Sequence, residues 1–371
     1  MNAKNTTKQS HFDTLLALIV CALVLTGIVM VYSASAVYAQ EEYQDSLYFL
    51  KRHLLWVLIG TGVLVAALKT DYHKLHALTY PAMAGTLGLL LMVMLPGLGM
   101  EAGGARRWLS LGVFNFQPSE LAKFTVILFI ARSMVKRADK LRDFAYGYLP
   151  NLIVLGIFFT LILLQPDFGT ALIISVVAFT MLFVAGVRPK FLVYSVLAVL
   201  PFLVTAVLSH TYRTRRILAF LDPWQDRADS GFQAVQSFLA FGQGGFWGLG
   251  LGDSRQKLFY LPEAHTDFIY SVIGEELGLV GALGVLILFG MLLWRGFSTA
   301  YRARDLFGTH LAFGLTLVIG IQALTNMGVA TGILPTKGLT LPFISLGGSS
   351  LVVSMLSMGV LLNISEHATR A

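Results

Sequence analysis

The sequence predicts an all-α, multi-pass membrane protein with about ten transmembrane helices, and two observations carry this prediction. Hydrophobic residues make up 56% of the 371 residues and charged residues 13%, against roughly 45–50% and about 25% in soluble globular chains. Apolar segments of about 20 residues, the length that crosses a bilayer, recur along the chain. The mean hydropathy of the chain, +0.72, excludes a soluble enzyme and a disordered chain. The net charge of +7 therefore reflects membrane topology, and nucleic acid is not expected as a partner.

Ten segments fit a transmembrane helix, and the second and fourth are the weakest of them. They are Leu15–Ala34, Leu54–Leu68, Leu75–Leu95, Leu121–Val135, Leu149–Leu164, Phe168–Val187, Phe191–Leu208, Phe268–Trp294, Leu311–Leu334 and Phe343–Ile364. The first segment is longer than the apolar core of a signal peptide, and further spans follow it, so we expect an uncleaved anchor.

An even number of spans places both termini on one side of the membrane. Fifteen Lys and Arg then fall on the side of the termini and twelve on the other, but six of these twelve lie in one long loop. Because the excess of Lys and Arg in short loops marks the cytoplasmic side, we expect cytoplasmic N- and C-termini in the inner membrane. The chain is expected to form a single domain, residues 1–371, with a large outer loop, residues 210–266, between spans seven and eight.

Asp267 is the sharpest candidate for chemistry, because it directly precedes the eighth span on the outer side. A carboxylate at the boundary of water and lipid can accept a proton from a sugar hydroxyl. The alternative is that Thr266 or Asp267 only caps the helix. Glu263 and His265 belong to the same candidate site, and with Asp267 they make a weak metal-binding pattern.

Two further groups of polar residues are predicted on the outer side. Glu120 and Lys123 are one helical turn apart at the mouth of a span. They either hold an anionic, lipid-linked ligand or form an interfacial ion pair. Arg213, Arg215 and Arg216 oppose the positive-inside tendency and suit phosphate, although contact with lipid headgroups is the alternative.

Lys337 and Ser345 lie in a segment with two prolines before the last span. This segment either lines a polar cavity as a broken helix or starts a span that packs closely through small residues. The glycine-rich run 242–252 lacks the Gly-Lys-Ser/Thr of a phosphate-binding loop. We therefore expect no nucleotide there and interpret the run as a re-entrant or packed loop.

Five stretches of the sequence are similar to a known family. They are GARRWLSLGVFNFQPSELAK, QPDFGTALI, YRTRRILAFLDPW, YLPEAHTDFIYSVIGEELGLVG and LPTKGLTLPFISLGGSS. They resemble the SEDS family (shape, elongation, division and sporulation), and the threonine and lysine before GLTLP resemble its division type. The resemblance runs from the first span to the last. Leu346 departs from it, because the family usually has tyrosine there and leucine removes a hydroxyl from the last loop.

The resemblance implies a peptidoglycan glycosyltransferase, an inverting hexosyltransferase that polymerises lipid II at the outer face of the cytoplasmic membrane, at the division septum. Lipid II is a disaccharide-pentapeptide on undecaprenyl pyrophosphate. The family's essential aspartate maps onto Asp267, and the acid and lysine of its QPSELAK run map onto Glu120 and Lys123. The resemblance also implies a divalent cation (Mg²⁺ or Mn²⁺), no nucleotide or organic cofactor, a class B penicillin-binding protein as transpeptidase partner, and other divisome membrane proteins.

Two other functions compete with polymerisation. A lipid II flippase should carry polar groups through the depth of the membrane, whereas the acids and arginines of this chain gather at its outer end. A scaffold for a penicillin-binding protein would need no catalytic acid, so it would tolerate Asp267→Asn. The placement of the charges favours the polymerase.

Overall fold

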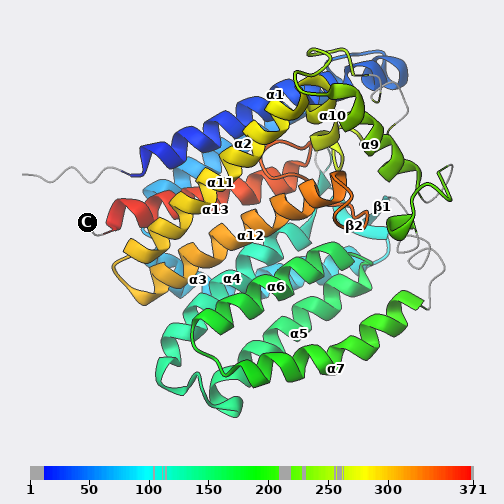
Figure 1. The fold of residues 1–371 in the computed structure, drawn as a ribbon. Coiled ribbons are helices and arrows are strands. Elements are labelled where there is room, and N and C mark those ends of the chain that lie inside the picture. The colour runs from blue at the N-terminus through cyan, green and yellow to red at the C-terminus, as the bar shows by residue number, and fades with distance from the viewer. Residues whose placement is uncertain are drawn as a thin grey trace, which may run out of the picture.

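The computed structural model describes residues 12–102, 105–110, 112, 115–208, 219–227, 231–254, 256, 261 and 263–368. Figure 1 shows a bundle of long helices that run roughly side by side. Within the described residues, seven helical segments are long and apolar enough to cross a membrane. They are α1 (Thr14–Tyr43), α2 (Tyr48–Lys69), α3 (His73–Met94), η2 with α5 (Phe144–Tyr148 and Leu149–Leu164), α11 (Gly278–Arg302), α12 (Leu306–Ala330) and α13 (Gly348–His367).

Three more helices lie beside these seven: α4 (Pro118–Lys136), α6 (Phe168–Val184) and α7 (Pro189–Leu208). α6 and the first part of α7 are apolar but shorter. α4 is buried along most of its length, so it faces protein more than lipid and tolerates a less hydrophobic sequence. The predicted all-α membrane fold is confirmed, while the count of ten spans stays a prediction.

The bundle has two distinct ends. Asp13 N–H donates to Ser365 Oγ at 3.0 Å, so α1 begins where α13 ends (Figure 1). We call this the terminal end. The opposite end, the loop end, carries α9 (Phe232–Gly244) and α10 (Ile269–Glu276). The described part of the chain therefore begins and ends at the same end of the bundle, and the side of the membrane that this end faces stays a prediction.

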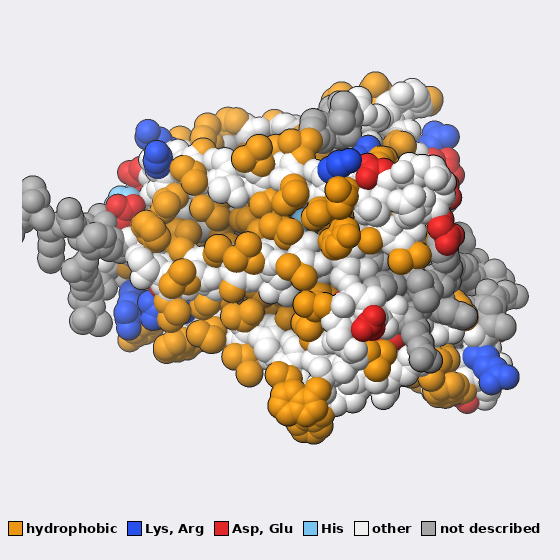
Figure 2. Space-filling model, turned by 90° about the horizontal axis from the view of Figure 1, so that it is seen from above, with side chains coloured by type: hydrophobic (Ala, Val, Ile, Leu, Met, Phe, Trp, Pro, Cys, Tyr) orange, Lys and Arg blue, Asp and Glu red, His pale blue; other side chains and the backbone are white. Residues whose placement is uncertain are grey.

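The surface between the two ends is apolar. Figure 2 shows hydrophobic side chains over the middle of one face and charged side chains mainly toward its two ends. Leu18 of α1 and Leu58 of α2 are examples of large apolar side chains that are mostly exposed. Such a band matches the hydrocarbon core of a bilayer, where exposing leucine costs nothing.

A small sheet at the loop end is not indicated by the sequence pattern. β1 (Gly99–Ala102), β2 (Ala105–Ser110) and β3 (Asn115–Phe116) pair antiparallel in the order β1-β2-β3. Arg107 of β2 donates to the backbone oxygen of Gln165 at 3.0 Å. The sheet therefore joins α3 to α4 and is anchored to the turn between α5 and α6.

The eighth predicted span, Phe268–Trp294, is not a single helix. α10 ends at Glu276, and α11 begins after Leu277 at Gly278, whose φ is +66°. A left-handed φ is readily adopted only by glycine. Glu275 and Glu276 interrupt the apolar run directly before this break, but they do not by themselves predict that the helix ends there.

The glycine-rich run fills the break between α10 and α11. The Leu249 N–H donates to the Glu275 oxygen and the Gly250 N–H to the Glu276 oxygen, both at 3.0 Å. A Cβ on Gly248 would lie 2.1 Å from the Glu276 oxygen, so only glycine permits this approach. The run is a packed loop, and α10 stops because its last carbonyls bond this loop instead of a further helical turn.

Candidate active site

The segment between α12 and α13, residues 331–347, turns back into the bundle from the loop end. Leu341, Phe343 and Ile344 are fully buried. Gly27 of α1 is packed against the re-entering backbone, because a Cβ on it would lie 2.5 Å from the backbone oxygen of Phe343. At a rise of 1.5 Å per residue, Gly27 lies about 20 Å from the start of α1. The segment thus reaches close to the middle of α1. Non-helical backbone is tolerated at membrane depth where protein surrounds it, as happens here, and we call residues 331–347 the re-entrant loop.

Asp267 lies in the turn 263–268, which is tied to the re-entrant loop by hydrogen bonds. Ser345 Oγ donates to the Thr266 oxygen at 2.5 Å. The Leu346 N–H donates to the His265 oxygen at 3.0 Å. The predicted site residues around Asp267 and Ser345 are therefore brought together, although 79 positions separate Thr266 from Ser345 in the sequence.

Two residues with left-handed backbone flank this contact. Glu263 has φ +58° and Phe343 has φ +67°, and each such non-glycine conformation costs of order 1–3 kcal/mol. Thr266 Oγ1 donates to Glu263 Oε2 at 2.7 Å and closes the turn. Backbone strain of this kind collects at functional sites, which is consistent with a site at this turn.

The backbone of Asp267 is held by α12. α10 starts at Ile269 after Phe268, whose side chain does not cap it. The alternative that Thr266 or Asp267 caps this helix stays open. Asn326 Nδ2 donates to the backbone oxygen of Asp267 at 2.8 Å and to the backbone oxygen of Leu339 at 2.6 Å. One buried amide thus holds the turn and the re-entrant loop together.

The carboxylate of Asp267 lies against the backbone of Gly338. A Cβ on Gly338 would lie 3.1 Å from Asp267 Oδ2, closer than nearly all such contacts. The neighbouring residue is Lys337, whose Nζ lies 5.0 Å from the centre of the Phe168 ring. The structure therefore places a half-buried ammonium group one residue from the backbone that contacts the candidate base.

The ring of His265 packs against two aromatic rings at one side of the site. Its ring lies 4.8 Å from the Phe49 ring and 6.0 Å from the Tyr38 ring, between centroids. Burial lowers the pKa of His265, and the charge of Glu263 acts in the opposite direction. The imidazole is therefore held in its neutral form at pH 7, where it can accept or donate one hydrogen bond.

Glu120 and Lys123 form a buried ion pair at the start of α4. Lys123 Nζ lies 2.8 Å from Glu120 Oε2, and the two side chains are 4% and 8% exposed. Lys123 Nζ also donates to Gln322 Oε1 of α12 at 2.5 Å. Gln322 Nε2 in turn donates to the Thr340 oxygen at 3.0 Å and to Ser350 Oγ at 3.2 Å. The pair thus supports the re-entrant loop, and its predicted contact with substrate stays a prediction.

A second polar cluster lies where α4, α6 and α13 begin, and the sequence motifs did not indicate it. Ser119 Oγ and Gln117 Nε2 donate to Asp167 Oδ2 at 2.9 and 3.1 Å. Asp167 Oδ1 accepts the Thr170 N–H at 3.1 Å and caps α6. The Gln117 N–H donates to Ser349 Oγ at 2.9 Å. Asp167 directly before an apolar helix was the available signal, because aspartate is a favoured N-cap.

Two expectations are not decided by the structure. Arg213, Arg215 and Arg216 lie outside the described residues, so their predicted phosphate contacts stay a prediction. Among the residues that the structure describes, no three His, Cys, Asp or Glu side chains gather as metal ligands. A metal at this site would therefore need oxygens from elsewhere to complete its coordination.

The profile of the cell cycle protein family of FtsW, RodA and SpoVE matches residues 13–370. The chain belongs to this family. Among its members, the probable peptidoglycan glycosyltransferase FtsW of Geobacter metallireducens is 48% identical, over 99% of this chain and 98% of that protein. The stage V sporulation protein E of Bacillus subtilis is 43% identical, over 98% of this chain and 99% of that protein. The resemblance found in the sequence is confirmed.

Solved structures show that the fold is shared within the family. A chain of a peptidoglycan synthase complex, described as coordinating polymerization and crosslinking, superposes with a TM-score of 0.78 at 31% identity, over 95% of this chain and 97% of that chain. The rod shape determining protein RodA of Thermus thermophilus gives a TM-score of 0.69 at 28% identity, over 97% and 98%.

Proposed function

We propose that this family member is a peptidoglycan glycosyltransferase that polymerises lipid II at the outer face of the cytoplasmic membrane during cell division, with Asp267 as general base. The placement of Asp267 carries the proposal. Its carboxylate lies at the loop end against Gly338, the residue that follows Lys337 in the chain, and its backbone is held by Asn326. The relatives named as peptidoglycan glycosyltransferases support the reaction class.

The reaction joins a sugar hydroxyl of the acceptor to the anomeric carbon of the donor. The bond from that carbon to undecaprenyl pyrophosphate breaks, with inversion. A sugar hydroxyl is a very weak acid, so a base must take its proton as the new bond forms, and Asp267 accepts it. The pyrophosphate leaves with its negative charge, which Lys337 and, from the sequence, Arg213, Arg215 and Arg216 neutralise. Glu263, His265 and Ser345 shape the substrate-binding turn.

Glu120 and Lys123 affect the site indirectly, through Gln322 and the re-entrant loop. Lys123 is already bonded to Glu120 and Gln322, so direct contact with a phosphate requires this pair to open. The closed geometry favours a positioning role, in which the pair sets the re-entrant loop and, through it, Lys337.

A divalent cation, Mg²⁺ or Mn²⁺, fits this site if the substrate supplies part of its ligands. Mg²⁺ is commonly bound by one or two carboxylates together with substrate phosphates. Glu263, exposed in the same turn as Asp267, is the carboxylate that would hold it. When bound, the cation would neutralise charge on the pyrophosphate.

The partner and the membrane orientation belong to the same proposal. A similar chain is part of a peptidoglycan synthase complex, which supports a class B penicillin-binding protein as transpeptidase partner, with other divisome membrane proteins at the septum. We propose cytoplasmic termini in the inner membrane. In a Cys21→Ser background, Ser46→Cys should react with an impermeant maleimide in intact spheroplasts, whereas Arg304→Cys should react only after lysis. The reverse pattern would contradict this orientation.

The function is tested by polymerisation of labelled lipid II with purified protein, its transpeptidase partner and a divalent ion. Wild type should make glycan chains, and Asp267→Asn should make none at equal folding. Asp45→Asn is the matched control, because Asp45 is an exposed carboxylate at the same end that pairs with Lys51. Activity in both variants would exclude Asp267 as base. Inactive wild type with a competent partner would instead favour the flippase or scaffold function.

A further inference from the structure

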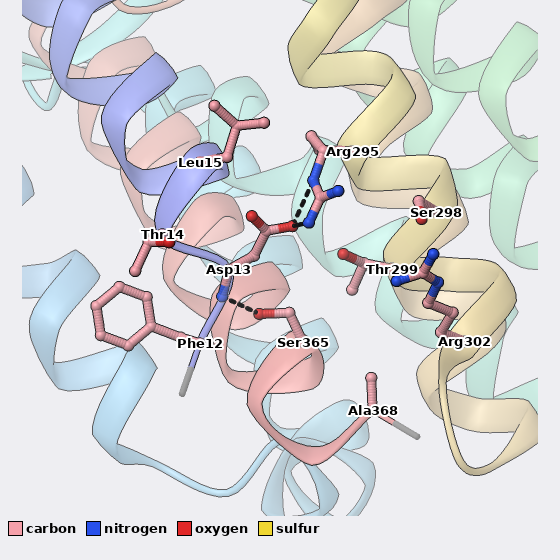
Figure 3. Close-up of a pocket in the computed structure, with 10 residues that line it drawn as sticks. All are labelled: Phe12, Asp13, Thr14, Leu15, Arg295, Ser298, Thr299, Arg302, Ser365 and Ala368. Atoms are coloured by element: carbon pink, nitrogen blue, oxygen red, sulfur yellow. Dashed lines mark hydrogen bonds and ion pairs between the residues drawn. The ribbon is translucent and has the colours of Figure 1, made fainter. Parts of the chain in front are cut away.

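A polar cavity of about 300 Å³ lies at the terminal end of the bundle, far from the candidate active site. It is formed where the first residues of α1, the last turns of α11 and the end of α13 meet (Figure 3). Its lining includes Asp13, Arg295, Thr299, Arg302 and Ser365. None of these residues has a part in the proposed reaction.

The cavity presents hydrogen-bond donors from one face of α11. Arg295, Ser298, Thr299 and Arg302 are spaced i, i+3, i+4 and i+7, which places them on one side of a helix. All four line the cavity. Figure 3 shows the side chains of Arg295 and Thr299 pointing from α11 toward the start of α1. Thr299 is only 4% exposed as a residue, and it lines the cavity beside the two arginines.

The charge of the cavity is positive. Asp13 Oδ2 lies 2.6 Å from one nitrogen of Arg295 and 2.7 Å from another, so these two charges balance. Arg302 has no carboxylate partner within the described ranges, and it leaves one net positive charge at the cavity. An arginine fork with a neighbouring hydroxyl is the arrangement that binds phosphate oxygens.

The surroundings of the cavity favour a lipid as the source of that phosphate. Trp294 and Tyr301 of α11 are 64% and 90% exposed, and Arg295 lies 5.6 Å from the centre of the Trp294 ring. Exposed aromatic rings of this kind mark the interface between lipid and water. Leu18, on the neighbouring surface of α1, is exposed and offers contact for acyl chains. The cavity volume is at the lower end for ligand sites, which suits a headgroup rather than a whole lipid.

We propose that this cavity binds the phosphate headgroup of an anionic phospholipid from the cytoplasmic leaflet. Basic pockets between transmembrane helices on the cytoplasmic side are typical sites for such headgroups. The occupied cavity would tie α1, α11 and α13 together at the terminal end. The proposal rests on the membrane orientation given above and not on the glycosyltransferase activity.

The test is a lipid titration of the full-length protein in detergent, with bound lipids counted by native mass spectrometry. Wild type should prefer phosphatidylglycerol over phosphatidylcholine. Arg302→Gln should weaken phosphatidylglycerol binding about fivefold, the usual effect of one basic residue at an anionic membrane surface. Arg304→Gln is the matched control, because Arg304 is exposed at the same end but does not line the cavity, and it should bind as wild type does. Thr299→Val should weaken binding without changing charge.

Three outcomes would overturn the proposal. Equal losses in Arg302→Gln and Arg304→Gln would show diffuse attraction to the membrane rather than a site. Thermal stabilisation by inorganic phosphate that depends on Arg302, without any by phosphatidylglycerol, would assign the cavity to a soluble phosphate compound. Displacement of the lipid by polyglutamate, with no preference between the two lipids, would assign it to an acidic peptide. Each variant is compared at an unchanged thermal midpoint, so a folding defect is separated from a binding defect.

Discussion

Lys123→Met should strongly destabilise the protein, because it leaves a buried carboxylate without a partner. Glu120 and Lys123 are almost completely buried and lie 2.8 Å apart. Methionine matches the length of the lysine stem but provides no donor. Both the Glu120 carboxylate and Gln322 Oε1 then lose the ammonium group that they share.

The magnitude follows from burial. Removing one partner of a buried ion pair costs about 3–5 kcal/mol, whereas replacing both partners by apolar side chains is often close to neutral. At about 1.4 kcal/mol per factor of ten, the single variant should raise the unfolding equilibrium constant roughly 100- to 4,000-fold. The double variant Glu120→Leu/Lys123→Met should recover most of this loss, less about 1–3 kcal/mol for the unpartnered Gln322 oxygen.

The assay is an unfolding titration in mixed micelles with sodium dodecyl sulfate, followed by tryptophan fluorescence, with lipid II polymerisation measured in parallel. Lys51→Met is the matched control. Lys51 also forms an ion pair of 2.8 Å, with Asp45, but its side chain is 62% exposed. Exposed pairs contribute little to stability, so this variant should unfold close to wild type.

Two results would refute this reasoning. If Lys123→Met unfolds at the wild-type midpoint, the ion pair does not stabilise the fold, and a pair that opens to bind substrate becomes the better explanation. If the double variant is stable but inactive, the charges are needed by the substrate and not by the fold. Full activity in a stable double variant would show that neither charge is needed by the substrate.

Three further predictions concern the loop end. Gly248→Ala should destabilise the protein much more than Gly252→Ala in the same unfolding titration, because both glycines have positive φ but only the first would place a Cβ 2.1 Å from a backbone oxygen of α10; equal losses would mean that only φ matters. Gly338→Ala should lower polymerisation about tenfold or more with little change in stability, since its Cβ would crowd the Asp267 carboxylate and misplace the base; wild-type activity would show that this contact is not needed. His265→Phe should reduce the loss of stability that the wild type shows when the pH is lowered. Burial lowers the pKa of the folded histidine, so below about pH 6.5 the unfolded chain binds more protons than the folded chain, and the stability of the wild type decreases as the pH decreases. An unchanged pH profile would contradict that role.

The sequence by itself determined the membrane class, the family and the identity of the main candidate residue. Hydropathy is a local property of about 20 consecutive residues, so the spans could be found without any knowledge of contacts. Asp267 stood out because an acid beside an apolar run is costly unless it has a function. The motifs carrying Lys337, Ser345 and Glu120 were also visible as short, polar interruptions of apolar sequence.

The tertiary structure alone decided what those residues do to one another. Ser345 bonds the Thr266 oxygen and Asn326 bonds the Asp267 oxygen, although 79 and 59 positions separate the partners. Local hydropathy holds no information about such contacts, and Asn326 lies unremarked inside an apolar helix. The break at Gly278 could not be derived from the neighbouring Glu275 and Glu276, because its cause is a distant glycine-rich loop that takes the hydrogen bonds of α10. Hydrophobic length places the chain in the membrane, whereas the site depends on backbone bonds that form only when the helices are packed.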